Sequence, residues 1–327
     1  MKKLFTLVLT LILATTLVAC GGGETKTDLR IGQALYEAHG TKAWATATVV
    51  MDGDKVVLAF IDEYQFMAAE TTVGVPNSEP LADYVTEGYV LGSKRVNNET
   101  YSANMAGAGS TVELADNYNY VQDFVKGKTI TELEEIVAME KEAVVDLVTG
   151  ATVVDAQGYI NTILLAAKAA QGTEAVAYAG KLEDLKINQL EGAAHGTKCF
   201  TLTTVVTDGT NIVLSHIDEF QYMDSATTVG VPNSENFVDY IIEGRQLVSK
   251  RVNNDVYSAN MAEAGSTVAI AANYDFVQAF ANGKTIAELK ELDAKTPEEV
   301  VDLVTGATVV DAQGYLAEIV RTAGSTK

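Results

Sequence analysis

Two threonine hydroxyls at equivalent places in the chain are the side chains best suited to carry a covalent group. Thr152 and Thr308 each end the heptapeptide Asp-x-x-Thr-Gly-Ala-Thr, and fourteen residues around each, Asp146–Tyr159 and Asp302–Tyr315, are identical. An apolar pattern of helical spacing follows, so the sequence predicts that each hydroxyl lies one residue before a helix. Helix N-termini stabilise negative charge, which favours a phosphate ester at these hydroxyls.

The other motif residues are interpreted as a loop that leaves the hydroxyl accessible. Glycine permits close backbone approach and unusual dihedrals, alanine keeps the surface low, and the leading aspartate is assigned to recognition or to holding the loop. These supporting positions are Asp146, Thr149, Gly150 and Ala151 in one copy and Asp302, Thr305, Gly306 and Ala307 in the other. The alternative is a plain turn and helix cap, in which the threonine, or Asp155 and Asp311, would serve as N-cap.

The repeated motif belongs to a duplication of the whole chain at a constant offset of 156 residues. Each copy has the length of an ordinary domain and can bury its own core. We therefore divide the chain into a signal peptide at 1–19, a tether at 20–27, domains at 28–171 and 184–327, and a linker at 172–183. The Ala-rich linker favours a helix or a short ordered connector.

The elements expected to position the motif are strands early and helices late in each copy. Alternating β-branched residues predict a hairpin of 46–51 and 56–66 around Asp52-Gly53-Asp54, repeated around Asp208-Gly209-Thr210. Helices are expected at 81–87, 118–125 and 130–138, at 237–243 in the second copy, and directly after the motif. This order predicts an α+β domain, present twice, with an antiparallel sheet and helices.

The N-terminus predicts export and a lipid anchor. Two lysines precede an apolar run that is too short to span a bilayer comfortably, and Leu17-Val18-Ala19-Cys20 resembles a bacterial lipobox. Cys20 is thus the expected lipidation site, and the mature chain is expected on the extracellular face of the cell membrane, held by acyl chains. An ordinary secretory signal with an incidental cysteine is the alternative.

Composition narrows the classes of function. The formal charge of −21 argues against nucleic acid as a partner. Cys199 is the only cysteine after Cys20, and the equivalent residue of the first copy is Ala43. Cys199 is therefore interpreted as a small core residue. His39 and His195 lack a cysteine or carboxylate at ligand spacing, so no metal site is expected. Motifs for hydrolytic or dinucleotide-linked catalysis are absent from the sequence, and no catalytic residues are assigned.

The heptapeptide resembles the flavinylation motif of the FMN-binding domain family, in which a flavin transferase esterifies FMN through its phosphate onto the last threonine. The resemblance covers most of each repeat in outline and is specific only at the motif. It implies two FMN groups, bound covalently through phosphoester bonds to Thr152 and Thr308. The chain is similar to the doubly flavinylated lipoproteins of extracellular electron transfer in Gram-positive bacteria.

That resemblance implies an electron carrier more than a catalyst with its own substrate. Electrons would come from a membrane quinone-linked oxidoreductase, pass between the flavins and leave to ferric iron or soluble flavins. Candidate neighbours of the rings, each of which could equally be a core, loop or solvated residue, are Tyr64, Phe66, Met67, the 71–77 loop, Lys94, Arg95 and Tyr101, with Phe220, Tyr222, Met223, Lys250, Arg251 and Tyr257. The competing functions are a surface lipoprotein that binds a small ligand or partner, and a flavin-dependent reductase.

Overall fold

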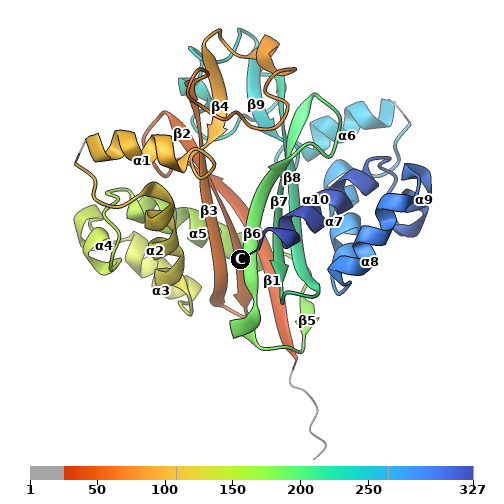
Figure 1. The fold of residues 1–327 in the computed structure, drawn as a ribbon, viewed down its shortest axis with the longest axis horizontal. Helices are drawn as coiled ribbons and strands as arrows, with labels where there is room; N and C mark the ends of the chain where they lie inside the picture. The colour runs from red at the N-terminus through yellow and green to blue at the C-terminus, as the bar shows by residue number, and fades with distance from the viewer. Residues whose placement is uncertain (1–25, 108, 264, 327) are drawn as a thin grey trace, which may run out of the picture.

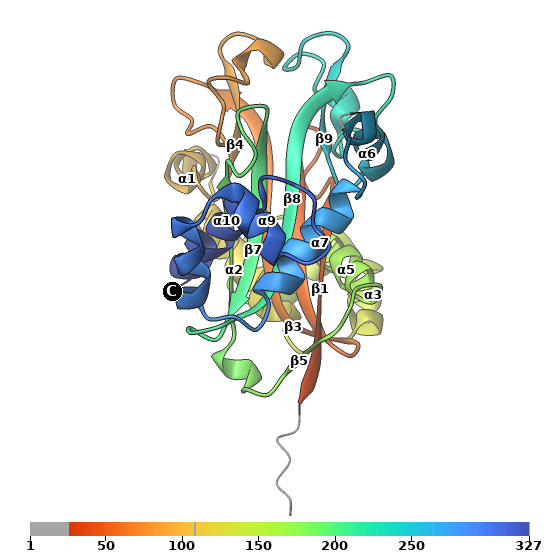
Figure 2. The same ribbon diagram turned by 90° about the vertical axis from the view of Figure 1, so that its right-hand side faces the viewer.

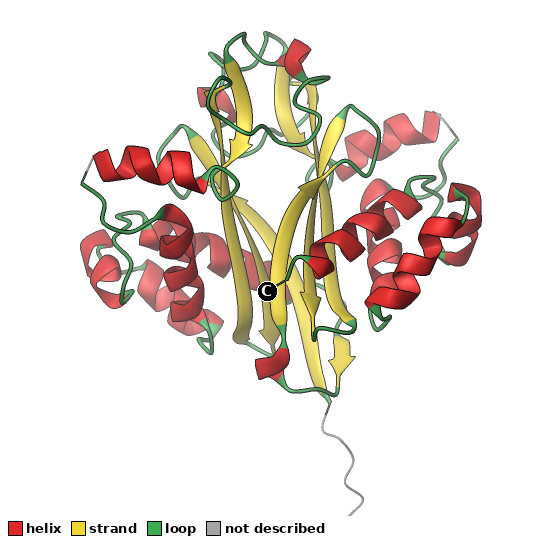
Figure 3. Cartoon of the chain, viewed as in Figure 1, coloured by secondary structure: helices red, strands yellow, loops and turns green. Residues whose placement is uncertain are grey.

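Two antiparallel sheets form the centre of the protein, flanked by helices, in a computed structural model that describes residues 26–107, 109–263 and 265–326 (Figures 1 and 3). The first sheet has strand order β4-β3-β2-β1-β5 and the second β6-β7-β8-β9. The strands are β1 Thr27–Tyr36, β2 Ala43–Asp52, β3 Lys55–Ala68, β4 Tyr89–Ser93, β5 Val176–Tyr178, β6 Lys186–Gly192, β7 Cys199–Thr207, β8 Ile212–Asp224 and β9 Arg245–Ser249. The expected α+β class is confirmed.

Five helices accompany each sheet in the described residues. Those of the first repeat are α1 Asn98–Gly107, α2 Leu114–Val125, α3 Ile130–Val137, α4 Lys141–Leu147 and α5 Ala156–Ala170. Those of the second are α6 Asn254–Glu263, α7 Ile270–Ala281, α8 Ile286–Lys290, α9 Pro297–Leu303 and α10 Ala312–Gly324. The helices expected near 118–125 and 130–138 are therefore confirmed as α2 and α3, and α3 begins at a capping box formed by Thr129 and Glu132.

The predicted hairpin is confirmed in both repeats. Strands β2 and β3 pair antiparallel from Asp52 and Lys55 outward, and β7 and β8 do the same. Gly53 and Gly209 have φ values of 59° and 92°, which the tight turn requires and which glycine adopts without strain.

The repeats pack as four layers, helix–sheet–sheet–helix (Figures 1 and 2). Strand β2 is buried at every position from Ala43 to Met51, because one face meets α5 and the other meets the second sheet. Aromatic side chains dominate the contact between the sheets: the Trp44 ring lies 4.7 Å from Tyr64 and 5.0 Å from Phe220. At the centre, the hydroxyls of the equivalent residues Thr48 and Thr204 lie 3.1 Å apart.

Two asparagines join the repeats reciprocally. The Asn77 Nδ2 atom donates to the carbonyl oxygens of Gly196 and Cys199, at 2.8 and 2.7 Å. Its counterpart Asn233 donates to Gly40 and Ala43 at the same two distances. Both asparagines have a positive φ, 66° and 68°, which is uncommon outside glycine. The 71–77 loop, one of the candidate ring neighbours, therefore helps to hold the two repeats together.

Other expectations differ from the structure. The helix expected at 81–87 is only a 3-10 turn at Ala82–Tyr84, and the one at 237–243 is absent apart from a turn at Ser234–Asn236. Instead, Val85 forms an antiparallel bridge with Ile241 of the other repeat, which requires extended backbone. The connector at 172–183 is ordered: it contains β5, which pairs with β1, and the start of a 3-10 turn at Leu182–Asp184, but no α-helix.

The lipobox and Cys20 lie outside the described residues. In the part of the chain that the structure describes, no helix is long and apolar enough to cross a membrane.

Candidate functional site

The motif forms an exposed loop between a short helix and a long one in each repeat. In the first repeat α4 ends at Leu147, the chain turns through Gly150 with φ 93°, and α5 begins at Ala156. Thr152 is exposed between them, as is Thr308 between α9 and α10. Each threonine side chain is therefore accessible at the surface.

A buried asparagine clamps the backbone of each loop. Asn117 of α2 is fully buried, and its Oδ1 atom accepts hydrogen bonds from the backbone N–H of Thr152 at 2.7 Å and of Val153 at 3.1 Å. Asn273 of α7 makes the same two contacts, at the same distances, with Thr308 and Val309. The hydroxyl is thus presented from a backbone that is fixed to the helix behind it. The sequence alone does not point to these asparagines, because they lie 35 residues before the threonine that each one holds.

The position of the helix corrects two expectations. The N-cap position of α5 is Asp155, so Thr152 lies three residues before it and not one residue before the helix. The threonine is therefore not the helix cap. Asp155 makes no capping hydrogen bond with its side chain, and instead its carboxylate lies 2.5 Å from Lys141 Nζ. The dipole of α5 consequently acts on the Thr152 hydroxyl less directly than expected.

The remaining motif residues form the loop surface. Asp146 and Asp302 are exposed on α4 and α9. Gly150 lies against the Tyr120 ring, where an added Cβ would approach Cε1 to 2.8 Å. Ala151 and Ala307 face inward, while Thr149, Thr305 and Gly306 are exposed.

Exposed apolar side chains flank both threonines at equivalent positions. Tyr120 and Phe276, which lie beside the motif glycines, are 41 and 38% exposed. Large apolar residues stay exposed on both sides of the threonine in the chain as well, Leu147 and Val154 in the first repeat and Leu303 and Val310 in the second. Such recurring exposure is unfavourable in water and is consistent with a surface that contacts an aromatic group or another protein.

Each repeat has a buried ion pair in the core between its helices and its sheet. The carboxylate of Glu63 lies 2.5 Å from Lys94 Nζ and accepts hydrogen bonds from Tyr118 and Tyr159. Burial opposes ionisation of Glu63, but Lys94 and His39 outweigh it and hold its pKa below the usual value. The sequence alone does not point to this cluster, because its two ions are 31 residues apart.

The second repeat adds two groups to the equivalent cluster. Glu219 pairs with Lys250 at 2.7 Å and also accepts from Thr201 at 3.0 Å, with the Cys199 Sγ atom 3.6 Å away. Burial, followed by the charge of Glu219, raises the pKa of Cys199 to about 12. Cys199 is therefore an unreactive core thiol, as its replacement by alanine in the first repeat had indicated.

These contacts correct the roles suggested for the two basic residues after β4. Lys94 is neither solvated nor free, because it pairs with Glu63 and lies over the Tyr101 ring. Arg95 donates to the Ile61 carbonyl oxygen at 2.5 Å and to Gln122 at 2.7 Å. Lys250 and Arg251 make equivalent contacts. The two lysines are therefore not available to compensate a negative charge at the surface, whereas the two arginines are partly exposed.

Strand alternation separates the other candidate ring neighbours. Tyr64 and Phe220 point into the contact between the sheets, away from the helix layers that hold the motifs. Met67 and Tyr101, with Thr71 and Thr72, instead line a hollow of about 290 Å³ beside α1. Phe66 and Tyr222 belong to the core between the sheets, although Phe66 also borders this hollow.

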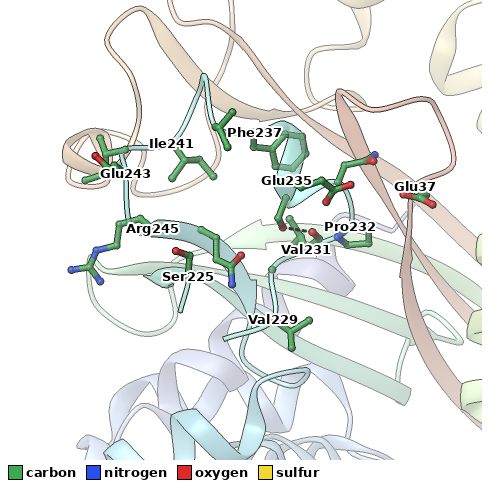
Figure 4. Close-up of a pocket in the computed structure, with 17 residues that line it drawn as sticks. Glu37, Ser225, Val229, Val231, Pro232, Glu235, Phe237, Ile241, Glu243 and Arg245 are labelled. Carbon is green, nitrogen blue, oxygen red and sulfur yellow. Dashed lines mark hydrogen bonds between the residues drawn. The ribbon is translucent and has the colours of Figure 1, made fainter. Parts of the chain in front are cut away.

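A larger hollow of about 790 Å³ lies mainly in the second repeat, with Glu37 of the first repeat at its border, away from the motif (Figure 4). Phe237, Ile241 and Val231 form its apolar wall, and Arg245 lies at one end. Val238 also lines it and is 73% exposed. None of its lining residues belongs to either heptapeptide, so it is a separate feature.

The histidines do have carboxylate neighbours in space. His39 Nε2 lies 3.7 Å from Asp155, and His195 Nδ1 lies 3.2 Å from Asp311. Both aspartates begin the helix that follows the motif. Within the described residues, no group of three or more histidine, cysteine, aspartate or glutamate side chains is arranged to hold a metal ion.

Comparison of the chain with protein-family models, with curated proteins and with solved structures found no match.

Proposed function

We propose that this protein is an electron-transfer flavoprotein that carries one FMN on Thr152 and one on Thr308 through phosphoester bonds. The observation that carries the proposal is the pair of exposed threonines on loops clamped identically by Asn117 and Asn273. Each clamp fixes the backbone while leaving the side chain accessible, as a modifying enzyme would require. The fold of each repeat is then an FMN-binding domain, as the resemblance of the motif implies.

The residues around the threonines fit such a group. Both threonines are exposed, and the partly exposed ring of Tyr120 or Phe276 lies beside the motif glycine two residues earlier. When bound, FMN would supply reversible two-electron chemistry. The chain's own contribution is attachment, which keeps the cofactor from being lost by dilution outside the cell, together with orientation by the clamped loop.

The partners follow from the resemblance and remain part of the proposal. A flavin transferase installs the cofactor, a membrane quinone-linked oxidoreductase supplies electrons, and ferric iron or soluble flavins accept them. Anchoring through a lipid on Cys20 would keep the carrier at the extracellular face of the membrane. The acidic surface, from a formal charge of −21, would attract cationic acceptors.

Intact mass of the mature protein from a host that contains the transferase tests the attachment. The expected increase is two FMN units less two waters, falling by one unit in Thr152→Ala and in Thr308→Ala. The double variant should be colourless and should not reduce ferric iron. Retention of both flavins in either single variant would refute the assigned positions.

A second candidate function is ligand binding in the hollow of the second repeat. It is favoured by two exposed apolar side chains, Val238 and Ile242, where the first repeat has Ala82 and Thr86. A protein that stays unmodified beside an active transferase, but binds an apolar fluorescent dye, would support it. The double variant Val238→Ala, Ile242→Thr should then no longer bind the dye.

A further inference from the structure

The two motif loops belong to opposite outer layers of the molecule. Thr152 is bound to α2, which packs on β3, and Thr308 is bound to α7, which packs on β8. Figure 1 shows α4 and α9, the helices that lead into the two loops, on opposite flanks of the paired sheets. Both sheets therefore lie between the two threonines.

The thickness of these layers sets a minimum separation. Packed sheets lie about 10 Å apart, and a helix with its side chains adds about 10 Å on each outer side. Loops in the two helix layers are therefore about 30 Å apart. The arrangement between the repeats is fixed by many contacts, among them the reciprocal bonds of Asn77 and Asn233 and the packing of the Trp44 ring against Phe220. A hinge motion that brought the loops together would have to break this buried core.

We infer that the two flavins exchange electrons with separate external partners, one on each flank, and do not pass electrons directly to each other. The inference rests on the proposed function and replaces the expected transfer between flavins. On each flank, the quinol-linked donor loses two electrons and the flavin gains them with two protons from solvent. Two ferric ions then take one electron each, and the protons return to solvent.

The surfaces of the two flanks agree with this division. Tyr120, Leu147 and Val154 are exposed on one flank, and the equivalent Phe276, Leu303 and Val310 are exposed on the other. Each flavin would therefore have its own apolar contact surface for a redox protein, instead of one surface shared by both. An electron taken up on one flank leaves from the same flank.

A distance measurement tests the geometry without any flavin. The full mature chain would carry nitroxide labels at Thr152→Cys and Thr308→Cys, with the buried Cys199 replaced by alanine, as in the first repeat. A label separation of about 30 Å or more is expected from the four-layer packing. A dominant population at half that separation or less would overturn the inference.

Reduction kinetics test the electron route. The time course of the doubly flavinylated protein should equal the sum of those of Thr152→Ala and Thr308→Ala, because each flavin reacts alone. A flavin that is reduced several-fold more slowly when the other is missing would show transfer between them and overturn the inference. Failure of the proposed function would be seen separately, as an intact mass without FMN.

Discussion

The Asn117 clamp allows the site and its stability to be tested with one substitution. Asn117→Ala removes four hydrogen bonds: those accepted from Thr152 and Val153, and two donated by Nδ2 to the carbonyl oxygens of Glu113 and Val112 at 3.1 and 3.3 Å. A neutral hydrogen bond contributes about 1 kcal/mol net, and water can partly replace the bonds at the exposed loop. We expect the free energy of unfolding to fall by about 2–4 kcal/mol.

The same variant should lose FMN at Thr152 while keeping it at Thr308, because the released loop no longer presents its hydroxyl in a fixed position. Urea unfolding would measure the stability, and peptide mapping of the flavinylated protein would locate the cofactor. Asn273→Ala is the matched control and should give the mirror result. Full flavinylation of Thr152 in Asn117→Ala, or a stability loss below about 0.5 kcal/mol, would refute the reasoning.

Three further predictions concern buried charge and the loop. Burial and the charge of Asp62 raise the pKa of Glu191 to about 7, so its protonated form favours the folded state. The free energy of unfolding should therefore fall by up to about 3 kcal/mol as the pH rises from 4.5 to about 7. Urea unfolding of Glu191→Gln should show a smaller decline over this range, and an unchanged decline would contradict the assignment. Lys94→Met should cost about 3–5 kcal/mol by leaving Glu63 buried without its partner. Adding Glu63→Gln should recover much of this loss in chemical unfolding. Gly150→Ala forces a Cβ against the Tyr120 ring at a positive φ and should reduce flavinylation at Thr152 only, as measured by peptide mapping, with Gly306→Ala as the control.

The hairpin and the helices α2 and α3 could be predicted because their signals are local, whereas the helices expected at 81–87 and 237–243 were wrong. Asp52-Gly53-Asp54 specifies a tight turn, and the helix that begins at Ile130 carries its own capping box. The exposed threonines were likewise found from the motif alone. These features depend on residues within a few positions of one another, so tertiary contacts did not alter them.

The missed features depend on pairing between distant segments. In the sequence, Lys94 and Arg95 after a strand are typical of solvated surface charges. Only the pairing of β3 with β4 brings Glu63 beside Lys94. One signal was present: β3 alternates, so Glu63 and Tyr64 must face opposite sides, and β2 carries no charged residue on either face from Ala43 to Met51. Together these two features indicate that both faces of each sheet are covered. This would have placed Tyr64 between the sheets and away from the motif.

The reciprocal bonds of Asn77 and Asn233 have an evolutionary consequence. Residue i of one repeat contacts residue j of the other, and j contacts i, which is the pattern of a two-fold symmetric homodimer. Joining the two subunits in one chain preserves that interface. It also removes the requirement that both sides of the axis carry the same residue.

One contact between the sheets differs in this way between the two halves of the molecule. Tyr64 donates a hydrogen bond to Glu191 at 2.9 Å, whereas the symmetry-related positions hold Phe220 and Leu35. A homodimer would carry the polar pair twice or not at all. The duplicated chain instead carries one polar and one apolar version of the same contact, so each half of the molecule can differ from the other.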